Sequence, residues 1–139
     1  MSFLLDTNAV SEWVKPRPNA GLMGWLADAD EDRIYLSVVT IAEIRHGIER
    51  LPASRRRARL DEWLSNELTV RFEGRLLTIE VGIADAWGKI VARREAQGRP
   101  IHAMDALLAA TAEVHKLTLV TRNASDFESA VSAVLDPWS

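Results

Sequence analysis

The first acidic residue of the chain, Asp6, stands directly after a short apolar run in the segment "FLLDTNAV". Phe3, Leu4 and Leu5 predict a buried strand, which places Asp6 at the carboxyl end of that strand. Removing a carboxylate from water at such a position is costly unless a partner compensates its charge. Asp6 is therefore a candidate for chemistry, and its partners are the acids that the fold brings beside it.

Three further acids stand next to predicted strands or at the start of predicted helices. Glu43, in "TIAEIRHGI", is expected in the first turn of the helix that follows the second strand. Asp105, in "MDALLAATA", is expected in the first turn of the helix before the fourth strand, and Asp126 follows that strand in "TRNASDF". Strand ends and the helix starts that follow them meet at one edge of a parallel sheet, so Asp6, Glu43 and Asp126 are expected to converge. Asp105 precedes its strand and joins them only if its helix begins near the same edge.

Convergence of these acids would create a site for a hard cation. Two like charges about 5 Å apart repel by roughly 3 kcal/mol at an effective dielectric constant near 20, and a cation or protonation relieves this repulsion. Oxygen ligands without histidine or cysteine favour Mg²⁺ or Mn²⁺ over zinc. Such an ion keeps several waters, is completed by substrate phosphate, and can activate water for attack on a phosphodiester.

Each acid also has a purely structural interpretation. Thr40 and Glu43 have the spacing of a capping box, in which the glutamate only returns a hydrogen bond to the threonine. The helix dipole favours Asp105 in a first turn without any function. Asp126 equally suits a turn or a helix cap, and Asn123 a turn. The prediction of a metal site depends on the convergence of the acids rather than on any one of them.

Short apolar segments alternate with helix-like segments along the chain. The predicted strands are Phe3–Asp6, Ile34–Ser37, Leu76–Ile79, Leu117–Thr121 and Ala133–Leu135. The predicted helices are Ala20–Ala29, Thr40–Leu51, Arg55–Leu68, Val81–Gln97 and about His102–His115. Strands separated by helices predict an α/β fold in which a central parallel sheet is flanked by helices on both faces. Ligands of such a sheet bind at the carboxyl ends of its strands, where the strand order reverses.

Length and composition limit the class of protein further. A chain of 139 residues is expected to form one domain over residues 1–139. Its net charge of −3 does not by itself indicate nucleic-acid binding, and the absence of cysteine excludes disulfides and thiolate metal sites. No apolar run approaches the roughly 20 residues of a membrane span, and the N-terminus does not have the pattern of a signal peptide. We therefore expect a cytoplasmic protein without membrane association.

The segments "LLDTN" followed by "SE", then "TIAEIRHGI", "MDALLAATA" and "TRNASDF", resemble the PIN-domain ribonucleases. The resemblance is strongest to the VapC toxins of bacterial toxin–antitoxin pairs, including their FitB-like branch, and it extends over essentially the whole chain. It implies a PIN-like nuclease domain with a parallel five-stranded sheet and an acidic pocket at its carboxyl edge. It also implies an endoribonuclease that depends on Mg²⁺ or Mn²⁺ and cleaves single-stranded or looped RNA by a metal-activated water, without a covalent intermediate.

Carried onto this sequence, the resemblance implies a catalytic site of four acids. Asp6, Glu43 and Asp105 would form its carboxylate core, with Asp126 as the fourth acid. Asp6 and Asp105 would hold the metal directly, whereas Glu43 and Asp126 would act on it directly or through water.

The resemblance also implies a supporting set of polar side chains. Thr7, Asn8, Thr121 and Asn123 match positions that orient the carboxylates or the attacking water. Some relatives carry an aspartate where this chain has Asn123. The fourth ligand is therefore Asp126, Asn123 or both through water, and we favour Asp126 because only it carries charge.

The family further implies protein partners. These are a second copy of the chain in a homodimer and a small VapB-like antitoxin that wraps the toxin, blocks the pocket and helps the pair bind operator DNA. Trp13, Trp25 or Trp63 could lie at such interfaces, although aromatic residues at helical spacing are more often part of a core.

The run "RRRAR" at residues 55–59 has two interpretations. It could guide an RNA backbone toward the pocket, which would add salt dependence to binding. The alternative is a solvated helix face partly paired with Asp61 and Glu62, and this is preferred because the run lies outside the four characteristic segments.

Two competing classes of protein remain. The segment "DTNAV" is one residue away from the signature of haloacid-dehalogenase-type phosphatases, but Asn8 stands where their second aspartate acts as acid and base. The chain has three lysines, and none is expected near a strand end. A non-catalytic protein of the same fold, which binds a partner and uses its acids as caps, is the other alternative. Such a protein should not respond to Mn²⁺, whereas a true acidic pocket should be stabilised by it.

Overall fold

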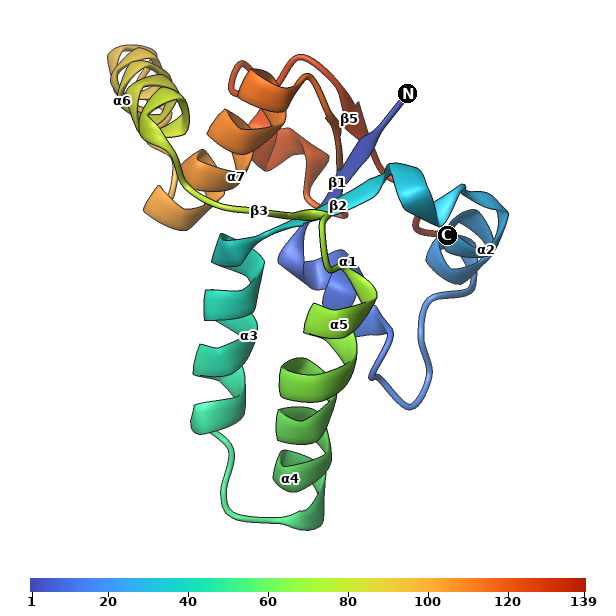
Figure 1. The fold of residues 1–139 in the computed structure, drawn as a ribbon. Coiled ribbons are helices and arrows are strands. Elements are labelled where there is room, and N and C mark those ends of the chain that lie inside the picture. The colour runs from blue at the N-terminus through green and yellow to red at the C-terminus, as the bar shows by residue number, and fades with distance from the viewer.

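Five parallel strands form one sheet in the computed structural model, which describes residues 1–139 (Figure 1). Their bounds are β1 (Phe3–Leu5), β2 (Ile34–Ser37), β3 (Leu76–Leu77), β4 (Thr118–Val120) and β5 (Val134–Leu135). The order across the sheet is β3-β2-β1-β4-β5, and every neighbouring pair is parallel. The predicted parallel five-stranded sheet is therefore confirmed, with strands somewhat shorter than expected.

The strand order reverses at β1, which lies in the middle of the sheet between β2 and β4. From β1 the chain builds outward to β2 and β3, and it then returns to the other side of β1 to add β4 and β5. The backbone N–H of Asp6 donates to the carbonyl of Val120 at 2.9 Å, so the carboxyl ends of β1 and β4 lie side by side. This is the position at which α/β sheets bind ligands.

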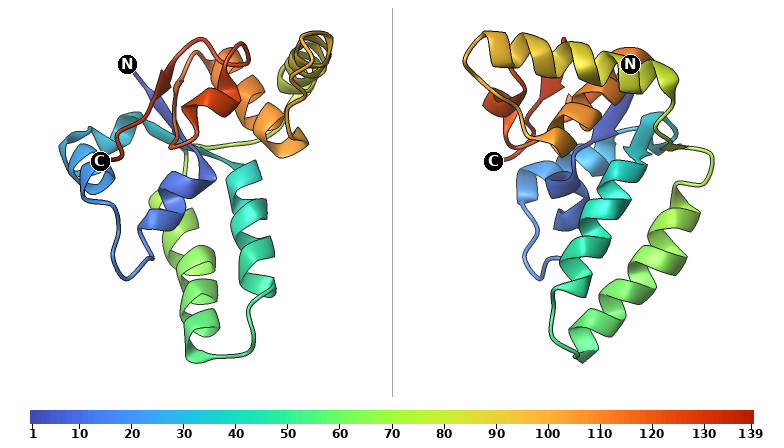
Figure 2. Two further views of the ribbon diagram at one scale, coloured as in Figure 1. Left: turned by 180° about the vertical axis from the view of Figure 1, so that it is seen from behind. Right: turned by 90° about the vertical axis from the view of Figure 1, so that its left-hand side faces the viewer.

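Helices cover both faces of the sheet, as Figures 1 and 2 show. The α-helices are α1 (Thr7–Glu12), α2 (Ala20–Asp28), α3 (Val38–Glu49), α4 (Arg55–Glu62), α5 (Thr69–Arg71), α6 (Val81–Ala96) and α7 (Ala103–His115). A π-helical segment, η2 (Trp63–Leu68), continues α4 into α5, and two 3₁₀ segments are η1 (Glu31–Arg33) and η3 (Ala124–Phe127). In both figures α3 and the α4–α5 rod project together from one side of the sheet, and α6 and α7 pack on the other. None of these helices has the length and apolar character needed to cross a membrane.

Alternation along the central strands divides the core into two layers. Leu4 and Leu119 face the layer formed mainly by α6 and α7, whereas Leu5 and Val120 face the layer that contains Phe72 and residues of α1, α2, α3 and η2. All five of these residues are fully buried. A strand whose successive side chains are all apolar is typical of a sheet covered on both faces, which is why "FLL" and "TLV" predict strands correctly.

Helix α1 was not predicted from the sequence. Asp6 is its N-cap, and the Asp6 carboxylate accepts a hydrogen bond from the backbone N–H of Thr7 at 2.7 Å. Six residues contain fewer than two turns, so no apolar period could reveal the helix. The preference of aspartate for N-cap positions was the signal available.

The start of α3 also differs from the prediction, and the capping-box interpretation of Thr40 and Glu43 is wrong. The N-cap is Ser37, whose hydroxyl accepts a hydrogen bond from the backbone N–H of Val39 at 3.0 Å. Thr40 lies inside the helix and is fully buried, and Glu43 lies in the second turn rather than the first. Glu43 is thus free of a capping role.

We expect Ser37→Ala to destabilise the protein by about 1–2 kcal/mol, because it removes the cap of a buried helix start. Ser54, whose hydroxyl caps the exposed start of α4, offers the matched control, and Ser54→Ala should cost less. Urea denaturation followed by circular dichroism measures both losses. An equal or larger loss for Ser54→Ala would contradict the assignment of the α3 start.

Candidate active site

A cavity of about 370 Å³ opens at the carboxyl ends of β1 and β4, and all but one of its lining residues are polar or charged. Three of the four predicted acids line it, and they come from the end of β1, from α3 and from α7. The complete lining is Asp6, Thr7, Asn8, Ser11, Lys15, Glu43, Asp105, Asn123 and Phe127. The structure therefore brings together the predicted carboxylate core of Asp6, Glu43 and Asp105.

Asp6 is the most constrained of these carboxylates. Its Oδ1 accepts from the backbone N–H of Thr7 at 2.7 Å, while its Oδ2 accepts from Thr121 Oγ1 at 2.7 Å and from Asn8 Nδ2 at 3.2 Å. Burial raises the pKa of Asp6 and the charge of Glu43 adds to that rise, whereas the three hydrogen bonds work in the opposite direction. The net result is a raised pKa, so the ionised form lacks full compensation.

Glu43 is held to the same cavity by α1. The hydroxyl of Thr7 donates to Glu43 Oε1 at 2.6 Å and lies 3.2 Å from the hydroxyl oxygen of the buried Thr40. Thr7 therefore touches two carboxylates, with its backbone on Asp6 and its side chain on Glu43. This contact fixes the distance between the end of β1 and the second turn of α3.

Asp105 reaches the cavity from the first turn of α7. The N-cap of that helix is His102, whose Nδ1 accepts from the backbone N–H of Met104 at 3.3 Å. Burial raises the pKa of Asp105, and the charges of Asp6 and Glu43 raise it further, while His102 lowers it. Asp6 and Glu43 are thus close enough to Asp105 for their charges to raise its pKa.

Asp126 and Asn123, the two candidates for the fourth ligand, occupy different places. Asn123 lines the cavity, and its backbone N–H donates to Thr121 Oγ1 at 3.0 Å. Asp126 lies exposed on η3 and outside the cavity lining, although its charge contributes to the raised pKa of Asp105. Behind this segment the buried guanidinium of Arg94 donates from Nη1 to the carbonyl of Asp126 at 3.0 Å.

The donors around the cavity suit a hard divalent cation. No group of three acidic or imidazole side chains stands already assembled as a metal-binding set. The chemistry of the donors nevertheless fits Mg²⁺ or Mn²⁺, since carboxylates line the cavity and neither histidine nor cysteine does. In addition, Asn8 Oδ1 is buried without a hydrogen-bond partner, while its amide nitrogen donates to Asp6. An unpartnered oxygen beside Asp6 is a ready ligand for an ion or an ion-bound water.

Several residues of this region were not predicted from the sequence. Ser11 and Phe127 line the cavity, and so does Lys15, although no lysine was expected near a strand end. Lys15 follows α1, the helix that was not predicted, so its approach to the acids could not be foreseen. Arg94 was hidden for another reason, because an arginine in an amphipathic helix ordinarily belongs to its solvated face.

The arginine run lies away from the acids, on the α4 helix and not on the cavity lining. Arg57 pairs with Glu49 at 2.6 Å, which ties α4 to α3. Asp61, predicted to pair within the run, instead pairs with Arg45 of α3 at 2.9 Å. Glu62 accepts a hydrogen bond from Asn66, so its predicted pairing with the run is also wrong.

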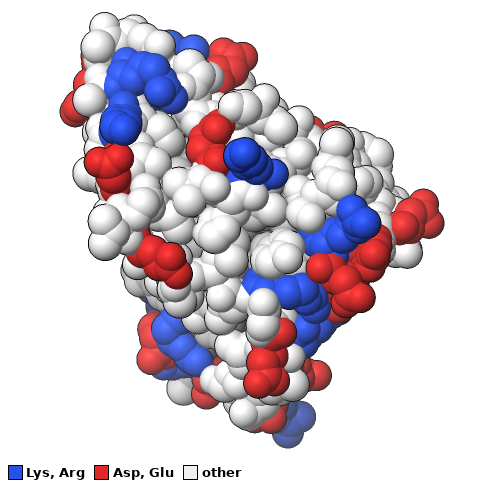
Figure 3. Space-filling view, turned by 45° about the horizontal axis from the view of Figure 1, so that its top comes forward, with Lys and Arg blue, Asp and Glu red and all other residues white.

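All three tryptophans named for interfaces, Trp13, Trp25 and Trp63, are partly buried and pack against the core. Phe3 and Trp25 meet edge to face with ring centroids 4.9 Å apart, and Trp13 contacts Phe72 at 6.0 Å. On the face drawn in Figure 3, acidic and basic side chains lie next to one another around a broad uncharged area. That face therefore carries no field of a single sign.

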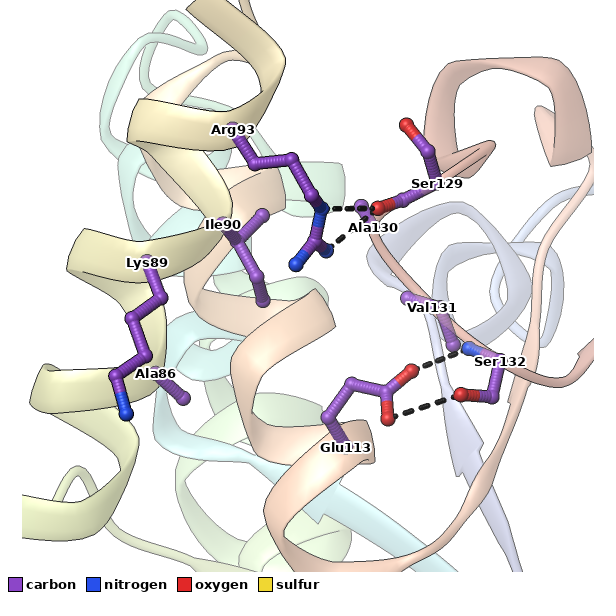
Figure 4. A pocket seen from close by; sticks show the side chains of 9 residues that line it. All are labelled: Ala86, Lys89, Ile90, Arg93, Glu113, Ser129, Ala130, Val131 and Ser132. Atoms are coloured by element: carbon purple, nitrogen blue, oxygen red, sulfur yellow. Dashed lines mark hydrogen bonds between the residues drawn. The ribbon is translucent and has the colours of Figure 1, made fainter.

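A second cavity, of about 420 Å³, lies between α6, the end of α7 and residues 129–132 (Figure 4). The Arg93 guanidinium donates to the carbonyl of Ser129, and the Glu113 carboxylate accepts from the backbone N–H of Ser132. Lys89 lies at its edge and pairs with Asp85 at 3.2 Å. None of its lining residues belongs to the acidic cavity.

Comparison with known proteins matches residues 3–131 to the PIN domain model. The chain is 36% identical over 135 residues to toxin FitB of Neisseria gonorrhoeae, which covers 97% of each protein. It is 32% identical over 135 residues to VapC ribonuclease Y4jK of Sinorhizobium fredii, covering 97% of this chain and 96% of that protein.

Solved structures give the same result. The fold superposes on a FitAB complex bound to a DNA fragment with a TM-score of 0.92 and 34% identity, over 99% of this chain and 96% of the other. A crystal structure of FitAcB from Neisseria gonorrhoeae matches with a TM-score of 0.92 and 36% identity, over 98% of each chain.

The raised pKa of Asp105 predicts how this residue affects the stability of the folded protein at different pH values. A carboxyl whose pKa is raised by folding contributes stability below its ordinary pKa, and that contribution is lost as the pH rises through the raised value. In metal-free protein at pH 7.5, Asp105→Asn should therefore raise Tm, at about 4 °C per kcal/mol for a chain of this size. The increase should shrink as the pH approaches 4.

Asp85 provides the control for this experiment, because it is an exposed aspartate on α6, distant from the acidic cavity. Asp85→Asn should change stability by no more than about 0.5 kcal/mol at either pH. Differential scanning calorimetry across pH 4–8 in EDTA measures both variants. A neutral or negative Tm change for Asp105→Asn at pH 7.5 would show that the acids do not repel one another.

Proposed function

This chain belongs to the PIN-domain family, within the branch that contains FitB and VapC proteins, and from that premise we propose that it is a divalent-metal-dependent endoribonuclease. In the proposal it is the toxin of a type II toxin–antitoxin pair and acts on RNA in the cytoplasm. One observation carries the proposal. Asp6, Glu43 and Asp105, from three elements far apart in sequence, line a single cavity at the carboxyl edge of the sheet.

Each carboxylate of the cavity would have its own role in the proposed reaction. When bound, Mg²⁺ or Mn²⁺ supplies a lowered pKa for water and stabilisation of the charge that develops on a phosphodiester. Asp6 and Asp105 would hold the ion, and Thr121 keeps the Asp6 carboxylate in one orientation by donating to its Oδ2. Thr7 occupies Glu43 Oε1, which leaves Oε2 to accept a proton from the attacking water or to bind the ion through water.

The fourth position has two candidates with different support. Asn123 is favoured by its place on the cavity lining, whereas Asp126 is favoured by its charge and its electrostatic effect on Asp105. We propose that Asp126 acts through water and Asn123 by direct contact with water or substrate. Arg94 fixes the backbone at Asp126 by donating to its carbonyl.

We propose the partners of this chain from the complexes in which its relatives are found. FitB and VapC proteins are seen in FitAB and VapBC complexes, several of them bound to DNA. By analogy this chain would form a homodimer, bind a cognate VapB-like antitoxin over the acidic cavity, and contact operator DNA only through that complex. The carboxylates would attract a basic side chain of the antitoxin for the same electrostatic reason that they attract a metal ion.

Two alternatives have less support. In a phosphatase of the haloacid-dehalogenase type an acid would stand at position 8, but here Asn8 donates a hydrogen bond to Asp6 instead. A protein that only binds a partner would use its acids as helix caps. Of the three acids on the cavity, only Asp6 is an N-cap, and the capping role offered for Glu43 is contradicted by the start of α3 at Ser37.

Loss of any core acid should abolish cleavage. We expect purified protein to cut RNA in Mg²⁺ or Mn²⁺ but not in EDTA, and Asp6→Asn, Glu43→Gln and Asp105→Asn each to reduce the rate by about 100-fold or more. Cleavage of total cellular RNA, followed by mapping of the ends, measures the rates. Asp85→Asn is the control. Activity that survives all three substitutions would refute the proposed site.

The fourth position can be assigned with the same assay. Asp126→Asn removes the charge and keeps the shape, whereas Asn123→Ala removes the amide that faces the cavity. If the proposal is correct, both variants lose activity less severely than Asp6→Asn, and the loss for Asp126→Asn grows at low metal concentration. A loss confined to Asn123→Ala would remove Asp126 from the site.

Metal binding can be tested without RNA. Mn²⁺ at 100 times its Kd should stabilise the wild-type protein by about 2.7 kcal/mol, and Asp6→Asn should respond weakly. Thermal unfolding of protein freed of its partner, with and without Mn²⁺, measures this. A wild type that does not respond would favour the binding-only alternative.

A further inference from the structure

Lys15 is the one positively charged side chain among the residues that line the acidic cavity. Its side chain is 47% exposed, so much of it is in contact with solvent. It lies in the connection between α1 and α2, outside any helix or strand. Its ion-pair partner, however, is not one of the acids that line the cavity.

The partner of Lys15 is Glu12, the last residue of α1. Glu12 is only 4% exposed, and its Oε1 accepts from the backbone N–H of Asn19 at 2.8 Å, while Oε2 pairs with Lys15. Asn19 in turn caps α2 by accepting from the backbone N–H of Leu22 at 3.1 Å. The Glu12 carboxylate is thus fixed on two sides and holds the lysine in one place.

Glu12 remains charged in this position. Burial alone would raise its pKa, but the contacts with Lys15 and Asn19 and the charge of Arg122 outweigh burial, and the pKa is lowered. Arg122 stands between Thr121, which binds Asp6, and Asn123, which lines the cavity. A second cation therefore lies close enough to Glu12 to lower its pKa.

We propose that Lys15 binds a backbone phosphate of the RNA beside the bond that is cut, and that Glu12 is the positioning residue that holds it there. This inference rests on the proposed ribonuclease function. An acidic cavity repels a polyanion except at the metal itself, so a strand that enters needs a cation for its adjoining phosphate. An ammonium group has three donors, and the pair with Glu12 leaves others for a phosphate oxygen.

The alternative for this ion pair is that it only closes the loop between α1 and α2. In that case its loss would change stability but not the interaction with RNA. A phosphate contact has a different signature, because each neutralised phosphate releases counterions and adds about 0.7 to the slope of log affinity against log salt for a single strand.

The test measures binding of a fluorescent single-stranded RNA by anisotropy, in Mg²⁺ and at several salt concentrations. All variants are made in the Asp105→Asn protein, which is expected not to cleave the RNA during the measurement. We expect Lys15→Met to weaken binding about tenfold at low salt and to reduce the salt slope by about 0.7. Lys15→Arg should keep most of the affinity. Lys89→Met, which removes another ion-paired lysine, from the lining of the second cavity, is the matched control and should change neither quantity.

Glu12 is tested in the same background. Glu12→Gln keeps the charge of Lys15 but releases it, so affinity should fall while the salt slope stays. Lys15→Met leaves a buried carboxylate without its partner, so the double variant Glu12→Gln, Lys15→Met is included to preserve folding. It should bind RNA as weakly as Lys15→Met while melting closer to the parent protein.

The outcomes separate this inference from the proposed function. If the wild type cuts RNA but Lys15→Met binds it as well as Lys89→Met does, the inference falls and the ribonuclease stands. If the wild type cuts no RNA but Lys15→Met still loses affinity and salt slope, the phosphate contact stands and the cleavage assignment falls. A protein that binds no RNA at all overturns the inference.

Discussion

The hydrogen bonds that compensate the buried Asp6 carboxylate are the interaction on which the cavity depends. They join the end of β1 to the start of α1 through Thr7 and Asn8, and to the end of β4 through Thr121. Thr7 then extends the connection to Glu43 on α3. One carboxylate therefore aligns elements that are distant in the sequence, and it does so without being fully satisfied, since its pKa is still raised.

Two buried charged side chains support the loops around this centre from behind. Glu12 holds the connection between α1 and α2, and Arg94 donates to the backbone carbonyls of Asp126 and Glu128. Each is 4% exposed and bonded to backbone groups. A buried charge of this kind adds little to net stability but penalises alternative loop conformations, which would leave it unpaired. The cavity is thus framed by loops with one favoured conformation.

The sequence predicted the sheet and the long helices, and it indicated Asp6, Glu43 and Asp105 as acids that could meet, because apolar strands and carboxylates at element ends are local patterns. Whether Asp105 reaches the same edge was not predicted. A helix that immediately precedes a parallel strand nevertheless runs opposite to that strand, so it begins at the carboxyl edge of the sheet. Tertiary contacts decided the rest. Ser37 rather than Thr40 caps α3, and the approach of Lys15 to the acids follows from α1, which has too few residues to show a period.

The central place of β1 has a consequence for when the acidic cavity is completed during synthesis. One neighbour of β1 is β2, made early, but the other is β4, which begins at Thr118. Thr121, the side chain that secures the Asp6 carboxylate, arrives later still. A nascent chain that stops before this point has an open sheet edge and only part of the cavity. Pairing over such a sequence separation is also slow. The interval before completion is a window in which the chain is present but its cavity is not.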